Sequence, residues 1–125
     1  MIVGTPYSPA KAFIAFAKDF IGSIAGGDFG KATSGLDADD GGHRWTKSEI
    51  VSALRRVAPK GVSPPDDIAR SAEPQLEEIA PADVFELSHR LPSNGKWTDA
   101  RVTFRFERKH GEYFRVLLVG FERAG

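Results

Sequence analysis

The chain of 125 residues contains no cysteine, a single methionine and no excess of charge of either sign. Without cysteine it cannot form a disulfide scaffold, an iron–sulfur cluster, a zinc ribbon or a thiol nucleophile. Seventeen basic residues balance seventeen acidic ones. The net charge therefore gives no reason to expect nucleic acid or an anionic membrane as a partner. We also expect no cofactor.

Long apolar runs are also missing. No stretch approaches the ~18 apolar residues that a membrane-spanning helix needs. The first residues lack the charged start, apolar core and small-residue cleavage site of a secretory signal. We therefore expect a cytoplasmic protein without membrane contact, and the length is typical of a single domain covering residues 1–125.

Helix signals fill the first half of the chain. Apolar residues recur at three- and four-residue spacing from Pro9 to about Ala25, and Ser8 is suited to cap this first helix. Asp28 is suited to cap a short second helix. Thr46-Lys47-Ser48-Glu49 fits a capping box that starts a third helix, which Pro59 stops.

The next segment, residues 59–82, combines five prolines with acidic residues. Proline restricts both itself and the residue before it, so this composition predicts an extended connector. At most one short turn of helix is expected within it, near residues 75–79.

From Asp83 onward apolar and polar residues alternate, which is typical of strands. Three strands are expected, separated by turns at Asn94-Gly95 and His110-Gly111. The predicted fold is α+β, with three N-terminal helices (the helical part, 8–58) packed on a C-terminal three-stranded antiparallel meander (the sheet, 83–123). In the last strand, Leu117, Val119 and Phe121 are expected opposite the core face, which makes a homodimer possible.

Motifs for metal binding or catalysis are weak. The segment Asp37-Ala38-Asp39-Asp40-Gly41-Gly42 resembles a calcium loop, but Gly41 stands where the third oxygen ligand belongs, so we expect a solvated turn and no metal. Nucleophile elbows and phosphate-binding glycine loops do not occur in the sequence. No catalytic residue can be named from the sequence.

Five residues could line a site. His43 precedes the third helix, His89 lies in a predicted strand, and Asp99 could act as an acid or base if it lies in an apolar pocket. Trp45 and Trp97 could line a pocket between the first helix and the sheet. Buried structural histidines and solvent-facing carboxylates are the commoner outcome for such residues.

The polar side of the predicted sheet carries four arginines and one tyrosine, namely Arg90, Arg101, Arg105, Arg115 and Tyr113. Arginine guanidinium groups beside an aromatic ring are well suited to recognise carboxylates or phosphates. Pairing with glutamates on neighbouring strands explains the same residues without any ligand. Both interpretations stay open, and RNA binding is not favoured because Tyr113 alone would be available for stacking.

The segments Phe13-Ile14-Ala15-Phe16 and Gly27-Asp28-Phe29-Gly30 resemble the start of nuclear-transport-factor-like and cystatin-like domains. This resemblance implies a cone-shaped pocket between helices and sheet, which holds an isomerase or hydrolase site in some members and a ligand or protein contact in others. The chain also looks like small uncharacterised bacterial proteins. In general character it is similar to toxin-immunity proteins, which mask a toxin by surface complementarity.

Two functions are therefore considered. The leading hypothesis is a small binding module without catalysis, of immunity or regulatory type, that contacts a protein partner through the acidic segment 58–82 or the arginine-bearing sheet face. The alternative is a small-molecule-binding protein or an acid–base enzyme with its pocket between the first helix and the sheet.

Overall fold

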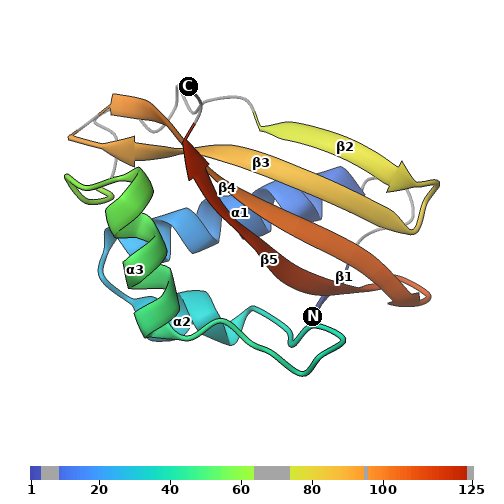
Figure 1. The fold of residues 1–125 in the computed structure, drawn as a ribbon. Coiled ribbons are helices and arrows are strands. Elements are labelled where there is room, and N and C mark those ends of the chain that lie inside the picture. Colours follow the sequence, from blue (N-terminus) through green and yellow to red (C-terminus); the bar gives the residue numbers. More distant parts are fainter. Residues whose placement is uncertain (4–8, 64–73, 95, 124–125) are drawn as a thin grey trace.

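The computed structural model describes residues 1–3, 9–63, 74–94 and 96–123. These residues form an α+β fold in which helices pack on one side of a five-stranded antiparallel sheet of order β1-β5-β4-β3-β2 (Figure 1). The elements are β1 (Ile2–Val3), α1 (Pro9–Ala25), α2 (Phe29–Ser34), α3 (Lys47–Val57), β2 (Gln75–Ala80), β3 (Val84–Ser93), β4 (Lys96–His110) and β5 (Tyr113–Arg123). The predicted fold class is confirmed.

Local signals predicted the positions of the three helices, and the expected cap of the first, Ser8, lies outside the described residues. The Asp28 carboxylate accepts a hydrogen bond from the Lys31 backbone amide at 3.0 Å and so caps α2. At the start of α3, the Thr46 hydroxyl accepts from the Glu49 amide at 3.3 Å, while Glu49 Oε1 accepts from the Thr46 amide at 3.0 Å. This reciprocal pair is the predicted capping box, and it satisfies two backbone donors that have no partner within the helix.

The predicted three-stranded meander is too small, because β1 and β2 add a strand at each edge of the sheet. The expected turn of helix near 75–79 was wrong. These residues belong to β2, which pairs antiparallel with β3, so that Glu77 lies opposite Glu86. The predicted connector 59–82 thus contains a strand, and its residues 64–73 lie outside the described residues. The Gln75–Ala80 segment has no strong alternation of its own, so its pairing with β3 decides its conformation.

A bulge in β5 changes which residues face the helices. Phe104 pairs with Leu118 and Thr103 pairs with Gly120, so Val119 is the extra residue. Gly120 has φ 156, which its missing Cβ permits. Beyond the bulge Phe121 lies opposite the buried Val102 on the helix-covered face, and the expectation that it points the other way was wrong.

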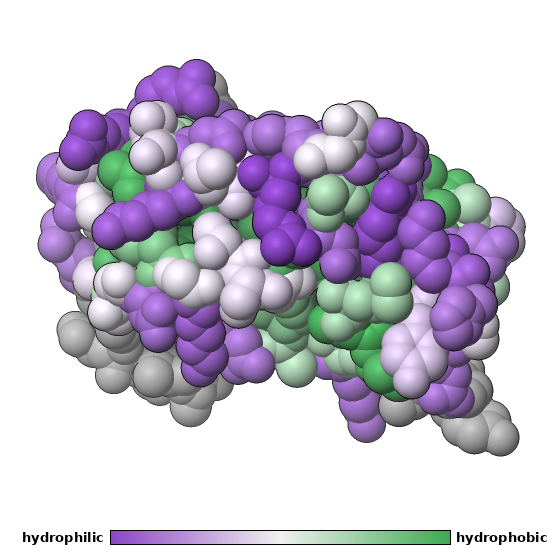
Figure 2. All heavy atoms as spheres, turned by 90° about the horizontal axis from the view of Figure 1, so that it is seen from below, coloured by the Kyte–Doolittle hydropathy of each residue, from purple (hydrophilic) through white to green (hydrophobic). Residues whose placement is uncertain are grey.

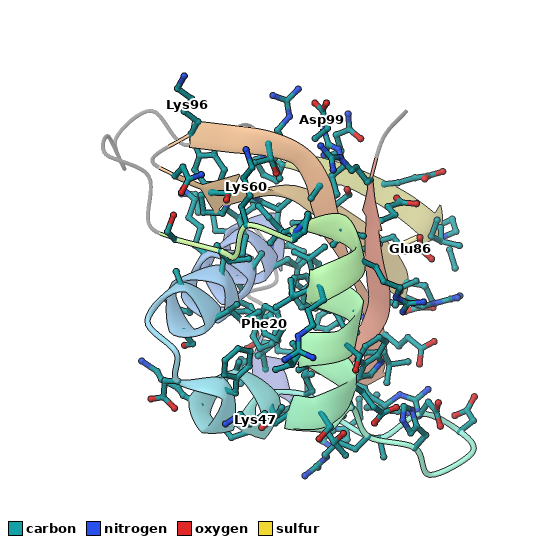
Figure 3. All side chains as sticks on the ribbon, turned by 60° about the vertical axis from the view of Figure 1, so that its left-hand side comes forward. Phe20, Lys47, Lys60, Glu86, Lys96 and Asp99 are labelled. Atoms are coloured by element: carbon teal, nitrogen blue, oxygen red, sulfur yellow. The ribbon has the colours of Figure 1, made fainter. Side chains whose placement is uncertain are left out.

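Phenylalanine rings fill the space between α1 and the sheet. Phe13 stacks on Phe106 with ring centroids 4.2 Å apart and meets Phe114 edge-on at 5.0 Å. Phe20 meets Phe104 edge-on at 4.9 Å, and Figure 3 shows Phe20 between the helices and the sheet. Such contacts add to the free energy gained by burying the rings. This core joins the sheet to α1.

Among the described residues, no helix combines the length and the apolar composition that crossing a membrane requires. Seen from below the view of Figure 1, hydrophobic residues show as small areas separated by hydrophilic ones (Figure 2).

Candidate functional site

The sheet has one face covered by helices and one face turned away from them, which we call the outer face. Side chains alternate along a strand, so the residues between the buried ones on β3 and β4 belong to this outer face. Glu86, for example, projects on the side of the sheet away from α1 (Figure 3). The outer face comprises Gln75, Glu77, Val84, Glu86, Ser88, Arg90, Arg101, Thr103, Arg105, Glu107, Tyr113, Arg115, Leu117 and Glu122.

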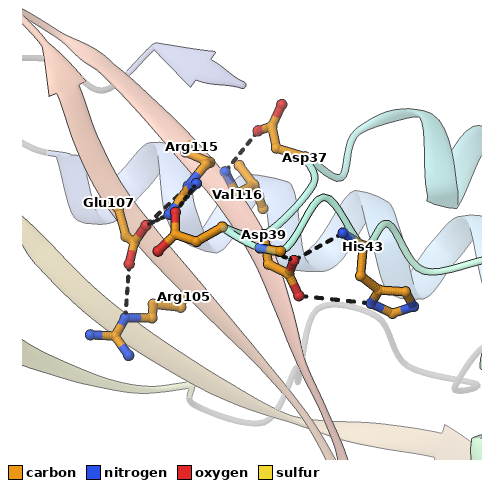
Figure 4. A network of polar contacts seen from close by, with 9 residues as sticks. Asp37, Asp39, His43, Arg105, Glu107, Arg115 and Val116 are labelled. Carbon is orange, nitrogen blue, oxygen red and sulfur yellow. Dashed lines mark hydrogen bonds and ion pairs between the residues drawn. The ribbon is translucent and has the colours of Figure 1, made fainter.

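Two of the predicted ligand-binding arginines are already paired within the chain. Arg115 donates to Glu107 through Nε at 3.0 Å and to Asp40 through Nη1 at 2.9 Å (Figure 4). Arg105 lies 3.3 Å from Glu107 and 3.9 Å from Glu86. Hydrogen bonding to Glu107, and then to Asp40, raises the pKa of Arg115. Cross-strand pairing thus explains Arg105 and Arg115 without a ligand.

The same arginine also lowers the pKa of Asp40. The hydrogen bond from Arg115 is the main cause, followed by its positive charge. Because Asp40 is almost fully exposed, water screens this pair, and it contributes little to the free energy of unfolding.

Elsewhere on the outer face, like charges lie directly opposite each other. Arg90 on β3 faces Arg101 on β4, and Glu77 on β2 faces Glu86 on β3. Arg101 donates to the Ser88 hydroxyl at 3.3 Å, and no ion pair joins Arg90 or Arg101 to a carboxylate among the described residues. Directly opposed like charges destabilise a sheet. Opposite charges lie on the next strand in each case, Arg105 across from Glu86 and Glu122 across from Arg101, and they offset part of this cost.

A shallow hollow of 250 Å³ separates the two like-charged pairs. Its floor carries the short side chains of Ser88 and Thr103, which lie opposite each other, with Gly120 next along on β5. The hollow is lined by Gln75, Leu76, Glu77, Glu86, Ser88, Arg101, Thr103 and Glu122. Its rim therefore combines carboxylates and one guanidinium around small polar groups.

The acidic segment after α2 is a structural loop. Asp37 accepts from the Val116 amide at 2.8 Å, Asp39 accepts from the amides of Gly41 and His43 at 2.9 Å, and Asp40 pairs with Arg115. The carboxylates thus bind separate partners and do not converge on one point (Figure 4). In the described part of the chain, no three metal-ligating side chains come together.

His43 belongs to the same loop. Its Nε2 lies 2.8 Å from Glu49 Oε2, and its ring is about half exposed. The pKa of Glu49 is lowered, mainly by the hydrogen bond from the Thr46 backbone and then by the one from His43. His43 therefore supports the start of α3 rather than lining the predicted cleft.

His89 is completely buried on the helix-covered face of β3. Its Nδ1 lies 2.8 Å from the Arg90 carbonyl oxygen, so Nδ1 carries the proton and Nε2 the lone pair. Nε2 has no hydrogen-bond partner among the residues that the structure describes. Burial lowers the pKa of His89, opposed by the Arg90 carbonyl and assisted by the charges of Lys18 and Arg101. Its ring lies 5.3 Å from that of Trp97.

The remaining candidates lie apart. Trp45 packs edge-on against Phe121 at 5.9 Å, next to α3, and Tyr113 is exposed near the β4–β5 turn, 5.2 Å from the His110 ring. Asp99 is exposed at the end of the sheet that also carries Lys96 (Figure 3). The ten predicted residues thus occupy several regions of the molecule. Arg90, Arg101, Arg105, Arg115 and Tyr113 share the outer face.

The predicted pocket between α1 and the sheet, which the family resemblance also implies, is occupied by the phenylalanine rings of the core. A groove of 510 Å³ lies instead where the end of α3 meets the β3–β4 hairpin. It is lined by Val57, Ala58, Pro59, Lys60, Ser93, Asn94, Lys96, Trp97, Thr98 and Arg123. Sequence reasoning found only Trp97 of this set, because the other residues come from three distant segments without a shared motif.

Comparison with known proteins finds no match for this chain among family models, curated proteins or solved structures.

Proposed function

We propose that this protein is a binding module without catalytic activity, which contacts a protein partner through the outer face of the sheet. The observation that carries the proposal is the pair of like-charged contacts, Arg90 with Arg101 and Glu77 with Glu86. Taken by itself, each of these contacts is unfavourable, and Arg105 and Glu122 on the next strands offset it only in part. A partner with acidic groups opposite the arginines and basic groups opposite the glutamates relieves both repulsions.

The charged side chains beside these contacts are held in place before binding. Glu107 is shared by Arg105 and Arg115, which come from neighbouring strands. A charge array that is already ordered loses less conformational entropy when a partner binds. Complementary charge also accelerates encounter and excludes partners of the wrong pattern. This behaviour suits a regulatory or immunity-type protein that masks another protein by surface complementarity.

The proposal is tested by photo-crosslinking in native lysate. A photoreactive residue replaces Thr103 at the centre of the outer face, and the matched control carries it at Lys31 on α2. The expected result is one crosslinked protein from position 103 and none from position 31. The same crosslink should disappear in Arg90→Glu/Arg101→Glu and persist in Lys11→Glu/Lys31→Glu, which changes net charge equally. A crosslink that survives reversal of both outer-face arginines would contradict the proposal.

A further inference from the structure

The groove between α3 and the β3–β4 hairpin has features of a ligand site that lies apart from the outer face. Three elements build it: the turn after α3, the hairpin, and the end of β5. Its volume of 510 Å³ falls within the range of small-molecule sites. The hydrogen bond from the Ser63 amide to the Pro92 carbonyl, at 3.1 Å, ties the segment after α3 to the hairpin. The two walls are thus joined.

Positive charge dominates the lining. Lys60, Lys96 and Arg123 contribute three cations, and no carboxylate belongs to the described residues that line the groove. None of the three is ion-paired with another described residue. In Figure 3, Lys60 and Lys96 lie at the same end of the molecule, where α3 ends and β4 begins. Several cations around one hollow attract an anion and focus its approach.

The uncharged lining adds a hydrogen-bonding group and an apolar wall. The Ser93 hydroxyl oxygen is buried and has no hydrogen-bond partner in the described part of the chain. Buried hydroxyls are normally paired, so this one is available to a ligand after rotation about its Cα–Cβ bond. Thr98, in contrast, already donates to the Leu91 carbonyl at 2.7 Å. Val57, Pro59 and Trp97 supply apolar surface for the body of a ligand.

We propose that this groove binds a small organic phosphate. Three cations match a ligand with two or more negative charges, which a single phosphate ester supplies and a simple carboxylate does not. Lysine and arginine hold the phosphate oxygens, Ser93 donates a hydrogen bond, and the apolar wall takes the organic part. The lining of this groove shares no residue with the hollow on the outer face.

The test uses inorganic pyrophosphate as the probe, with acetate as the singly charged comparison. Titration calorimetry gives the affinity of the protein for each of the two anions. Fluorescence reports on the groove itself, because Trp45 and Trp97 are the two tryptophans of the chain and a Trp45→Phe background leaves Trp97 alone. Pyrophosphate should bind more tightly than acetate, shift the Trp97 emission, and bind less tightly as salt screens the charges.

The matched variants carry the same change in net charge. Lys60→Gln/Lys96→Gln should bind pyrophosphate about tenfold more weakly, whereas Lys11→Gln/Lys31→Gln, with two exposed lysines on α1 and α2, should bind as the parent does. Thermal unfolding checks that both variants remain folded. Equal affinity in both double variants, equal affinity for acetate and pyrophosphate, or binding without a Trp97 response would each overturn the proposal.

Discussion

Asp37 and Val116 are joined by two hydrogen bonds. The Asp37 amide donates to the Val116 carbonyl at 2.8 Å, and the Val116 amide donates to Asp37 Oδ2 at 2.8 Å. The amino group of Met1 lies 2.8 Å from the same carboxylate oxygen. One side chain thus holds the loop after α2 against the edge of β5, which places Asp40 beside Arg115 on the outer face.

Asp37→Ala should lower the free energy of unfolding by about 1–3 kcal/mol, because the buried Val116 amide loses its acceptor. Asp37→Asn keeps an acceptor oxygen and should lose less. Urea denaturation measures both variants. If both variants lost the same free energy of unfolding, the charge of Asp37 and not its hydrogen bond to Val116 would account for the loss.

Removing the cap of α3 tests the best local signal in the sequence. Thr46→Ala should cost about 1 kcal/mol, since the Glu49 amide loses its acceptor. Thr46→Ser keeps the hydroxyl and serves as the control. The midpoints of chemical denaturation should rank parent and Thr46→Ser above Thr46→Ala, and any other order would show that the capping box contributes nothing measurable.

Phe104→Ala should cost about 3–5 kcal/mol, because this ring is fully buried against Phe20. Val119→Ala, at the exposed bulge residue of β5, should change stability by less than about 0.5 kcal/mol. Thermal and urea unfolding of Phe104→Ala and Val119→Ala compare the stability contributed by a buried and by an exposed position of the sheet. Similar midpoints for the two variants would contradict the assignment of inner and outer faces.

Stability should fall as the pH drops below the ordinary histidine range. Burial lowers the pKa of His89 in the folded state, so the unfolded chain takes up a proton first, beginning near pH 6.5. Between the unfolded and folded pKa values the unfolded state binds more protons, and the free energy of unfolding decreases as pH falls, by at most about 1.4 kcal/mol per pH unit.

The control for this pH dependence is His89→Phe, which fills similar volume without a titrating group. Denaturation at pH 7.5 and pH 5.5 should show a smaller difference for the variant than for the parent. The lowered pKa values of Asp40 and Glu49 act at more acidic pH and do not overlap this window. A parent whose stability is the same at both pH values would contradict the buried neutral His89.

Sequence alone determined the features that depend on neighbours along the chain. The capping residues Asp28 and Thr46 act within one turn of helix, so their roles are readable from spacing. The alternation of Phe85, Leu87, Val102 and Phe104 likewise assigns the buried face of two strands before any pairing is known. These signals were sufficient for the α+β class.

Tertiary structure decided the features that depend on distant segments. The Gln75–Ala80 segment is a strand because β3 supplies its hydrogen bonds, and Phe121 turns inward because the bulge at Val119 shifts the pairing by one residue. The partners of Arg115 come from a loop 75 positions away and from the neighbouring strand. Register and long-range packing create these contacts, and no local pattern in the sequence encodes them.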